Sequence, residues 1–137
     1  MQRLIAQVLH SRIFYLLAST VLTSFFWWSA FHKLWNFEGA LGEMAHFGLQ
    51  PAWLFASATI AVQLLGSLAI ISASRWAWLG AGALGVFTLS TIPLAHRFWE
   101  MKGMQAFLEQ ALVQEHISLI GGLAIAAALV HARRQTT

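Results

Sequence analysis

The side chains that could do chemistry in this chain are few, and most of them stand where long apolar stretches begin or end. They are His32, Lys33, His96, Arg97, Glu115 and His116. Ionisable groups at the edge of lipid are energetically costly, which makes them candidates for function. If these stretch ends meet on one side of a helix bundle, they form a polar cup. Lys33 and Arg97 would supply its positive charge, and Glu115 would balance it. Snorkelling of the two cations to the interface is the simpler alternative, and it needs no ligand.

Two further polar residues extend this candidate site. Trp99 follows His96 in the same loop. Gln63 lies twelve residues beyond Pro51, about 18 Å deep at 1.5 Å per helical residue. Such a depth is near the middle of a bilayer, where the amide would hydrogen-bond another helix. We expect partners among Ser90, Thr91 and Ser118. If its helix begins late, Gln63 reaches the floor of the cup instead.

The histidines raise the question of a haem or a metal, because neutral imidazole is a good ligand. Nothing in the spacing of His32 and His96 requires both rings to face one bundle axis, so haem is not expected. Six histidines without cysteine or an HxxxH pair form no recognised zinc site, and we predict no metal. The GxSxG, P-loop and GxGxxG motifs are also absent, so no catalytic residue is identified.

The composition sets the surroundings of these groups. Only 9% of the 137 residues are charged and 58% are hydrophobic, whereas soluble domains carry about 25% charge. A small soluble enzyme or a disordered chain is therefore excluded. The bases that give the net charge of +3 are scattered singly or in pairs, so no nucleic-acid partner is expected.

Long apolar stretches point to a bilayer as the solvent. Residues 13–31, 51–74 and 76–95 contain no ionisable side chain apart from the Tyr15 phenol, and a shorter stretch covers 117–130. A bilayer core needs about 20 apolar residues, and its backbone groups must be satisfied within the segment, so these are helices. We predict one all-α domain, residues 1–137, with four transmembrane helices. Their ranges are about 13–35, 51–74, 76–98 and 113–132.

The loops predict an orientation. Basic residues on the side of the termini are Arg3, Arg12, Arg75, Arg133 and Arg134, against Lys33, Arg97 and Lys102 on the other side. This bias favours cytoplasmic termini. All five acids lie on the outer side. Apolar residues between 37 and 49 recur at near-helical spacing, which predicts a short amphipathic helix at the outer interface.

Two pairs of similar blocks indicate an internal repeat. Residues 32–39 resemble 96–103, and residues 64–70 resemble 119–125. The bundle would then consist of two helical hairpins in a parallel repeat, with His32 and His96 at equal depth. Gly66, among larger residues, marks one helix crossing.

These blocks resemble the DoxX family of small four-helix membrane proteins. The resemblance rests on residues 31–39, 46–51, 63–66, 96–99 and 118–122. It implies that the family's lysine and histidine fall on Lys33 and His96. The family's usual glutamate in the second helix falls on Gln63, where this sequence departs from the pattern. The resemblance implies a role as a partner subunit in a membrane redox complex. Thiosulfate:quinone oxidoreductase is the example known for the family.

The resemblance and the polar cup together predict a function. We expect a multi-pass protein of the bacterial inner membrane, surrounded by lipid. It would be an accessory or quinone-proximal subunit, in which His96 and Lys33 hydrogen-bond quinone carbonyls. Any enzymatic activity would be that of a quinone-linked oxidoreductase. One alternative is a carrier for a lipid or a small anion, using Lys33 and Arg97. The other is a structural subunit. All three are compatible with a homo-oligomer or a larger membrane partner.

Overall fold

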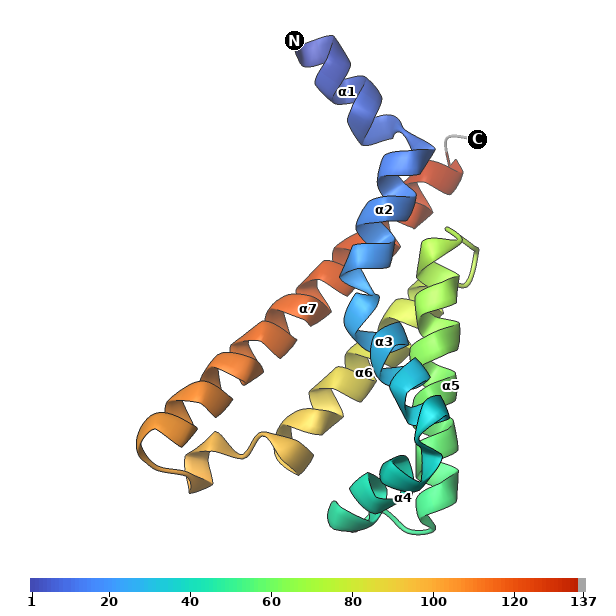
Figure 1. Cartoon of the computed structure of the whole chain (residues 1–137). Coiled ribbons are helices and arrows are strands. Elements are labelled where there is room, and N and C mark those ends of the chain that lie inside the picture. The colour runs from blue at the N-terminus through green and yellow to red at the C-terminus, as the bar shows by residue number, and fades with distance from the viewer. Residues whose placement is uncertain (136–137) are drawn as a thin grey trace.

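The computed structural model describes residues 1–135, and within that range it contains helices and no strand (Figure 1). The all-α prediction is confirmed for this part of the chain. In chain order the elements are α1 (Gln2–His10), α2 (Arg12–Leu22), α3 (Ser24–Trp35), α4 (Phe37–His46), α5 (Ala52–Ile71), α6 (Ala77–Ala95), the 3-10 turn η1 (Phe98–Glu100) and α7 (Gly103–Gln135).

Membrane-length helices account for most of the chain. Three segments are long and apolar enough to cross a bilayer: Ala52–Ile71, Ala77–Glu100 and Gly103–Gln135. A fourth crossing is available if α1 and α2, which are bent by 63° at their junction, count as one span. The described residues therefore supply three crossings, or four if the bent pair is one span. That fourth candidate covers residues 2–22 rather than the predicted 13–35.

The first predicted span, about 13–35, is not one continuous helix, because it is divided at Thr23 between α2 and α3. Hydroxyl groups compete for backbone carbonyls at this point. Ser19 Oγ donates to the Tyr15 carbonyl (2.7 Å), and Thr23 Oγ1 donates to the Ser19 carbonyl (2.8 Å). The Trp27 indole donates to the Thr20 carbonyl at 3.2 Å. Such side-chain bonds bend helices. The chain also forms α1 before this span, where the sequence analysis placed no element.

The last helix begins earlier than the predicted residue 113. Helix α7 begins at Gly103, whose φ of +63° suits a residue without a Cβ, and continues to Gln135. Neither Gly nor Pro occurs between Met104 and Val113 to interrupt it. Residues 103–112, which were predicted to precede the last helix, therefore belong to the same continuous helix as its apolar part.

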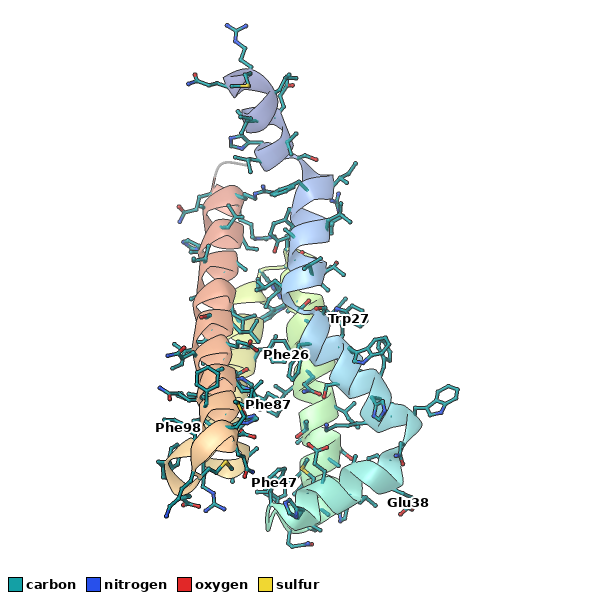
Figure 2. All side chains as sticks on the ribbon, turned by 60° about the vertical axis from the view of Figure 1, so that its left-hand side comes forward. Phe26, Trp27, Glu38, Phe47, Phe87 and Phe98 are labelled. Carbon is teal, nitrogen blue, oxygen red and sulfur yellow. The ribbon has the colours of Figure 1, made fainter. Side chains whose placement is uncertain are left out.

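Close packing of α5 against α6 forms the centre of the molecule. A Cβ added at Gly80 would lie 2.8 Å from the Gly66 carbonyl oxygen, so the two backbones touch. The crossing expected at Gly66 is therefore confirmed. Phe26, Leu84 and Leu123 bring α3, α6 and α7 into the same buried cluster. Figure 2 shows Phe26 and Phe87 facing one another inside the bundle, with their ring centroids 6.5 Å apart.

The helices alternate in direction, which gives the molecule two distinct ends. Helix α1, the end of α7 and the α5–α6 turn lie in the upper half of Figure 1, and we call this end of the molecule the terminus end. Helix α4 and the α6–α7 connection lie at the bottom, which we call the loop end. Helix α4 occupies the place predicted for a short helix between residues 37 and 49, and it packs Ala40 and Met44 against Ala56 of α5. The arrangement as two repeated hairpins stays a prediction.

Candidate functional site

A cavity of about 550 Å³ opens at the loop end, where α3, α4, α5, α6 and α7 converge. Its walls are largely aromatic and aliphatic. They include Phe25, Met44, Phe47, Phe55, Phe87 and Leu94. Pockets of about 300–1,000 Å³ with apolar walls and a few polar groups are typical of small-molecule sites. The polar side chains in this cavity form two groups.

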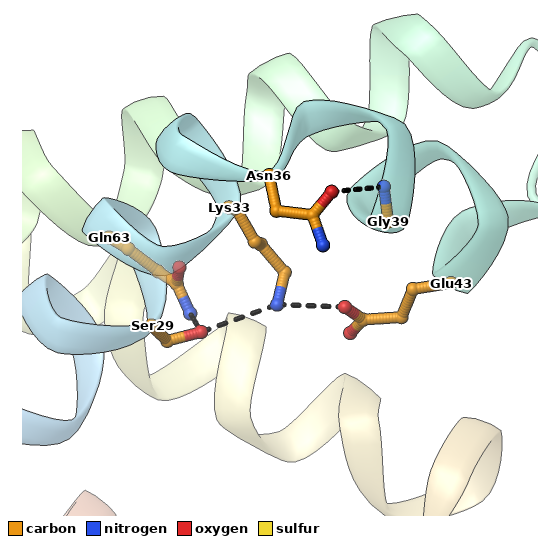
Figure 3. Close-up of polar contacts among 6 residues, drawn as sticks. All are labelled: Ser29, Lys33, Asn36, Gly39, Glu43 and Gln63. Atoms are coloured by element: carbon orange, nitrogen blue, oxygen red, sulfur yellow. Dashed lines mark hydrogen bonds and ion pairs between the residues drawn. The ribbon is translucent and has the colours of Figure 1, made fainter.

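The first polar group joins three helices through Ser29 (Figure 3). Lys33 Nζ of α3 lies 2.9 Å from Glu43 Oε2 of α4 and donates to Ser29 Oγ at 3.3 Å. Gln63 Nε2 of α5 donates to the same hydroxyl at 3.4 Å. The start of α4 fixes this geometry, because Asn36 Oδ1 caps the helix by accepting from the Gly39 amide at 3.0 Å. The cap determines which face of α4 presents Glu43 to Lys33.

Gln63 is buried with one polar atom unmatched. The residue is only 1% exposed, and its Oε1 has no hydrogen-bond partner among the described residues. Ser90, Thr91 and Ser118, the partners expected from the sequence, instead donate to carbonyls of their own helices. Since buried polar atoms are almost always paired, a hydrogen-bond donor on a ligand in the cavity would satisfy Gln63 Oε1.

The second polar group lies on the α6–α7 side. His96 Nδ1, at the end of α6, lies 2.8 Å from Glu109 Oε2 of α7. The rings of His96 and His116 meet edge to face, with their centroids 4.8 Å apart. His116 Nδ1 is engaged with the Leu112 carbonyl at 2.7 Å. In both histidines the Nδ1 contact orients the ring, which leaves Nε2 as the ring atom for a ligand.

The structure brings some of the predicted site residues together and separates the others. Lys33, Gln63, His96 and His116 line the one cavity. His32, Trp99 and Glu115 do not line it and are exposed. His32 and Glu115 each precede a lining residue by one position, and one position turns a side chain by about 100° around a helix. Arg97, also expected in the cup, pairs with Glu100 at 3.3 Å on the surface.

Sequence reasoning missed three partners in the site: Ser29, Glu43 and Glu109. Helical spacing could have found two of them. Ser29 precedes Lys33 by four residues, and Glu109 precedes His116 by seven, so each shares a helix face with its neighbour. Within residues 1–135, no group of three or more His, Cys, Asp or Glu side chains could hold a metal ion.

These features define a small helical membrane protein with a largely apolar cavity at one end, into which a few polar side chains converge. The family model described as DoxX matches residues 14–97, and the chain belongs to the DoxX family. This assignment and the apolar helices make it a membrane-integral protein. Neither a curated protein nor a solved structure matches the chain.

Proposed function

We propose that this DoxX-family protein is an accessory, quinone-proximal subunit of a membrane redox assembly, and that the loop-end cavity holds the quinone head group. The observation that carries the proposal is the cavity of about 550 Å³, in which aromatic walls surround a few convergent polar groups. A quinone ring is flat and apolar, with carbonyl oxygens at its edge. It therefore fits walls such as Phe25, Phe55 and Phe87.

The polar groups match the hydrogen-bonding needs of both redox forms. A quinone offers acceptors only. The Lys33 ammonium is a donor, and Nε2 of His96 is a donor in the imidazolium form, because Nδ1 already donates to Glu109. A quinol offers hydroxyl donors, and the unmatched Gln63 Oε1 is an acceptor. The chain would hold and orient the head group, while a partner subunit would supply or accept the electrons.

A carrier for a small anion has less support. The charge of Lys33 is already balanced by Glu43 at 2.9 Å, and that of Arg97 by Glu100 at 3.3 Å. A site without excess positive charge favours an uncharged ligand. A purely structural role predicts that the protein co-purifies with a membrane partner at fixed stoichiometry and that added quinone has no effect on its thermal stability.

The proposal also places the protein in a membrane. The arginine bias supports a bacterial inner membrane with both termini in the cytoplasm and the cavity on the opposite side. The quinone tail would then leave the cavity into the surrounding lipid.

The direct test is ligand-dependent stability of the purified protein in mild detergent. Decylubiquinone should raise the unfolding temperature of the native protein, because a ligand at about 100 times its Kd contributes about 2.7 kcal/mol. His96→Ala should lose this shift. His32→Ala is the matched control, because His32 is an exposed histidine outside the cavity.

Two results would contradict the proposal. One is an unchanged unfolding temperature for the native protein together with no quinone in an organic extract of the preparation. The other is an equal shift in both histidine variants, which would indicate partitioning of decylubiquinone into the detergent.

A further inference from the structure

A second hollow, which we call the basic groove, lies at the opposite end of the molecule. It measures about 660 Å³ and runs between the α5–α6 turn and the end of α7. Arg75, His131 and Arg134 bring basic side chains to it, and Ser74 adds a hydroxyl. The remaining lining residues are mainly apolar and comprise Trp78, Ala127, Ala128, Val130 and the polar Gln135. Basic groups beside an apolar wall match an amphipathic molecule with an anionic headgroup and an apolar tail.

The charge distribution of the whole chain favours an anionic partner at this end. Five arginines belong to it, and all five acidic residues of the chain lie between Glu38 and Glu115, in the segments of the loop end. No Asp or Glu side chain therefore belongs to the α5–α6 turn or to the end of α7, the two elements that form the basic groove. Arginine also suits phosphate, because its planar donors match phosphate oxygens in pairs.

The position of the groove matches the headgroup layer of a bilayer. Trp76 and Trp78 are 51% and 64% exposed at the start of α6, and tryptophan concentrates at membrane interfaces. Nearby α1 buries no residue and leaves Leu4, Ile5, Val8 and Leu9 exposed. Because these side chains share one helix face, lipid is the natural neighbour of this end.

We propose that the basic groove binds an anionic phospholipid. Arg75 and Arg134 contact the headgroup phosphate, and an acyl chain lies against Trp78 and Val130. Arg133 has a different role, because its Nη2 donates to the Leu9 carbonyl at 2.8 Å and its guanidinium lies 5.1 Å from the Tyr15 ring centroid. Arg133 thus ties α1 to α7 beside the groove.

Native mass spectrometry of the full-length protein in detergent tests this assignment. Phosphatidylglycerol should bind with higher affinity than phosphatidylcholine. Arg75→Gln should weaken phosphatidylglycerol binding about tenfold, the scale of one lost charge-assisted contact. Arg134→Gln provides a second variant if the first fails to fold. Arg97→Gln, which removes an exposed arginine at the loop end, should leave the affinity unchanged.

The source of the phosphate is resolved by two further probes. Inorganic phosphate and glycerol phosphate carry the charge without the acyl chains, so neither should compete with phosphatidylglycerol at equal concentration. Competition by either probe would overturn the lipid assignment, and so would equal affinity for the two lipids or equal loss in Arg97→Gln. None of these results bears on the quinone proposal, because the two sites lie at opposite ends of the molecule.

Discussion

At the residue scale, stability and binding make opposite demands on Gln63. Its amide is almost fully buried, and Oε1 lacks a partner among residues 1–135. A buried unmatched acceptor costs about 1–3 kcal/mol. Gln63→Leu removes that acceptor and only a long 3.4 Å bond to Ser29. We therefore expect the variant without ligand to match the native free energy of unfolding within about 1 kcal/mol or exceed it.

The same Gln63→Leu variant should lose most of the stabilisation by reduced decylubiquinone, because the acceptor for the quinol hydroxyl is gone. Thermal unfolding with and without the quinol measures both effects. Gln63→Met controls for the shape of the new side chain. A loss of more than about 2 kcal/mol without ligand would show that the amide is a structural bond rather than a vacant acceptor.

The ion pair of Lys33 with Glu43 should be stronger than the pair of Arg97 with Glu100. The side chains of Lys33 and Glu43 are 14% and 44% exposed, whereas those of Arg97 and Glu100 are 52% and 54% exposed, so the difference comes mainly from Lys33. Exposed pairs contribute about 0–1 kcal/mol, and burial reduces screening. Double-mutant cycles with Lys33→Met/Glu43→Gln and Arg97→Gln/Glu100→Gln should give a coupling of about 1 kcal/mol or more for the first pair and close to zero for the second. Equal couplings would contradict a stronger, less screened ion pair between α3 and α4.

Helix geometry explains which residues of the site could be predicted from the sequence and which could not. Lys33 and His96 stand at the ends of apolar runs, where a charge in the chain is conspicuous. His32 has the same placement in the chain but faces outward, because one residue rotates a side chain by about 100°. Glu109 was missed because the last helix was predicted to begin at residue 113, although Glu109 shares a helix face with His116.

At the element scale, the crossing of α5 and α6 depends on two glycines. A Cβ at Gly80 would lie 2.8 Å from the Gly66 carbonyl oxygen and 3.0 Å from the Ala69 Cβ. Backbone atoms cannot move aside, so Gly80→Ala should lower the free energy of unfolding by about 1–3 kcal/mol. Gly82→Ala lies in the same helix, and an added Cβ there meets nothing within 4 Å.

The control variant should be neutral or more stable, because alanine favours a helix by up to about 1 kcal/mol over glycine. Detergent-based thermal unfolding of both variants compares them directly. Equal effects of Gly80→Ala and Gly82→Ala would mean that α5 and α6 are not in backbone contact.

Apolar runs predicted the spanning elements because lipid leaves a backbone little choice but helix. The break at Thr23, in contrast, could not be predicted from apolar runs. It depends on which carbonyls the hydroxyls of Ser19 and Thr23 and the Trp27 indole select, and hydropathy is insensitive to that choice.

At the scale of the whole molecule, the two ends have opposite character. The loop end carries the acids and the aromatic cavity, and the terminus end carries five of the six arginines and the basic groove. Alternation of helix direction produces this separation, provided that the chain crosses the membrane an even number of times. Three crossings would place the two termini on opposite sides of the membrane.

Thiol labelling of single-cysteine variants measures this most directly, since the chain has no cysteine of its own. Gln2→Cys, Glu38→Cys and Gln135→Cys would each be exposed to a membrane-impermeant maleimide in right-side-out and inside-out vesicles. Residues 2 and 135 should react from one side of the membrane and residue 38 from the other. Reaction of residues 2 and 135 from opposite sides would contradict four crossings and, with them, the placement of the cavity.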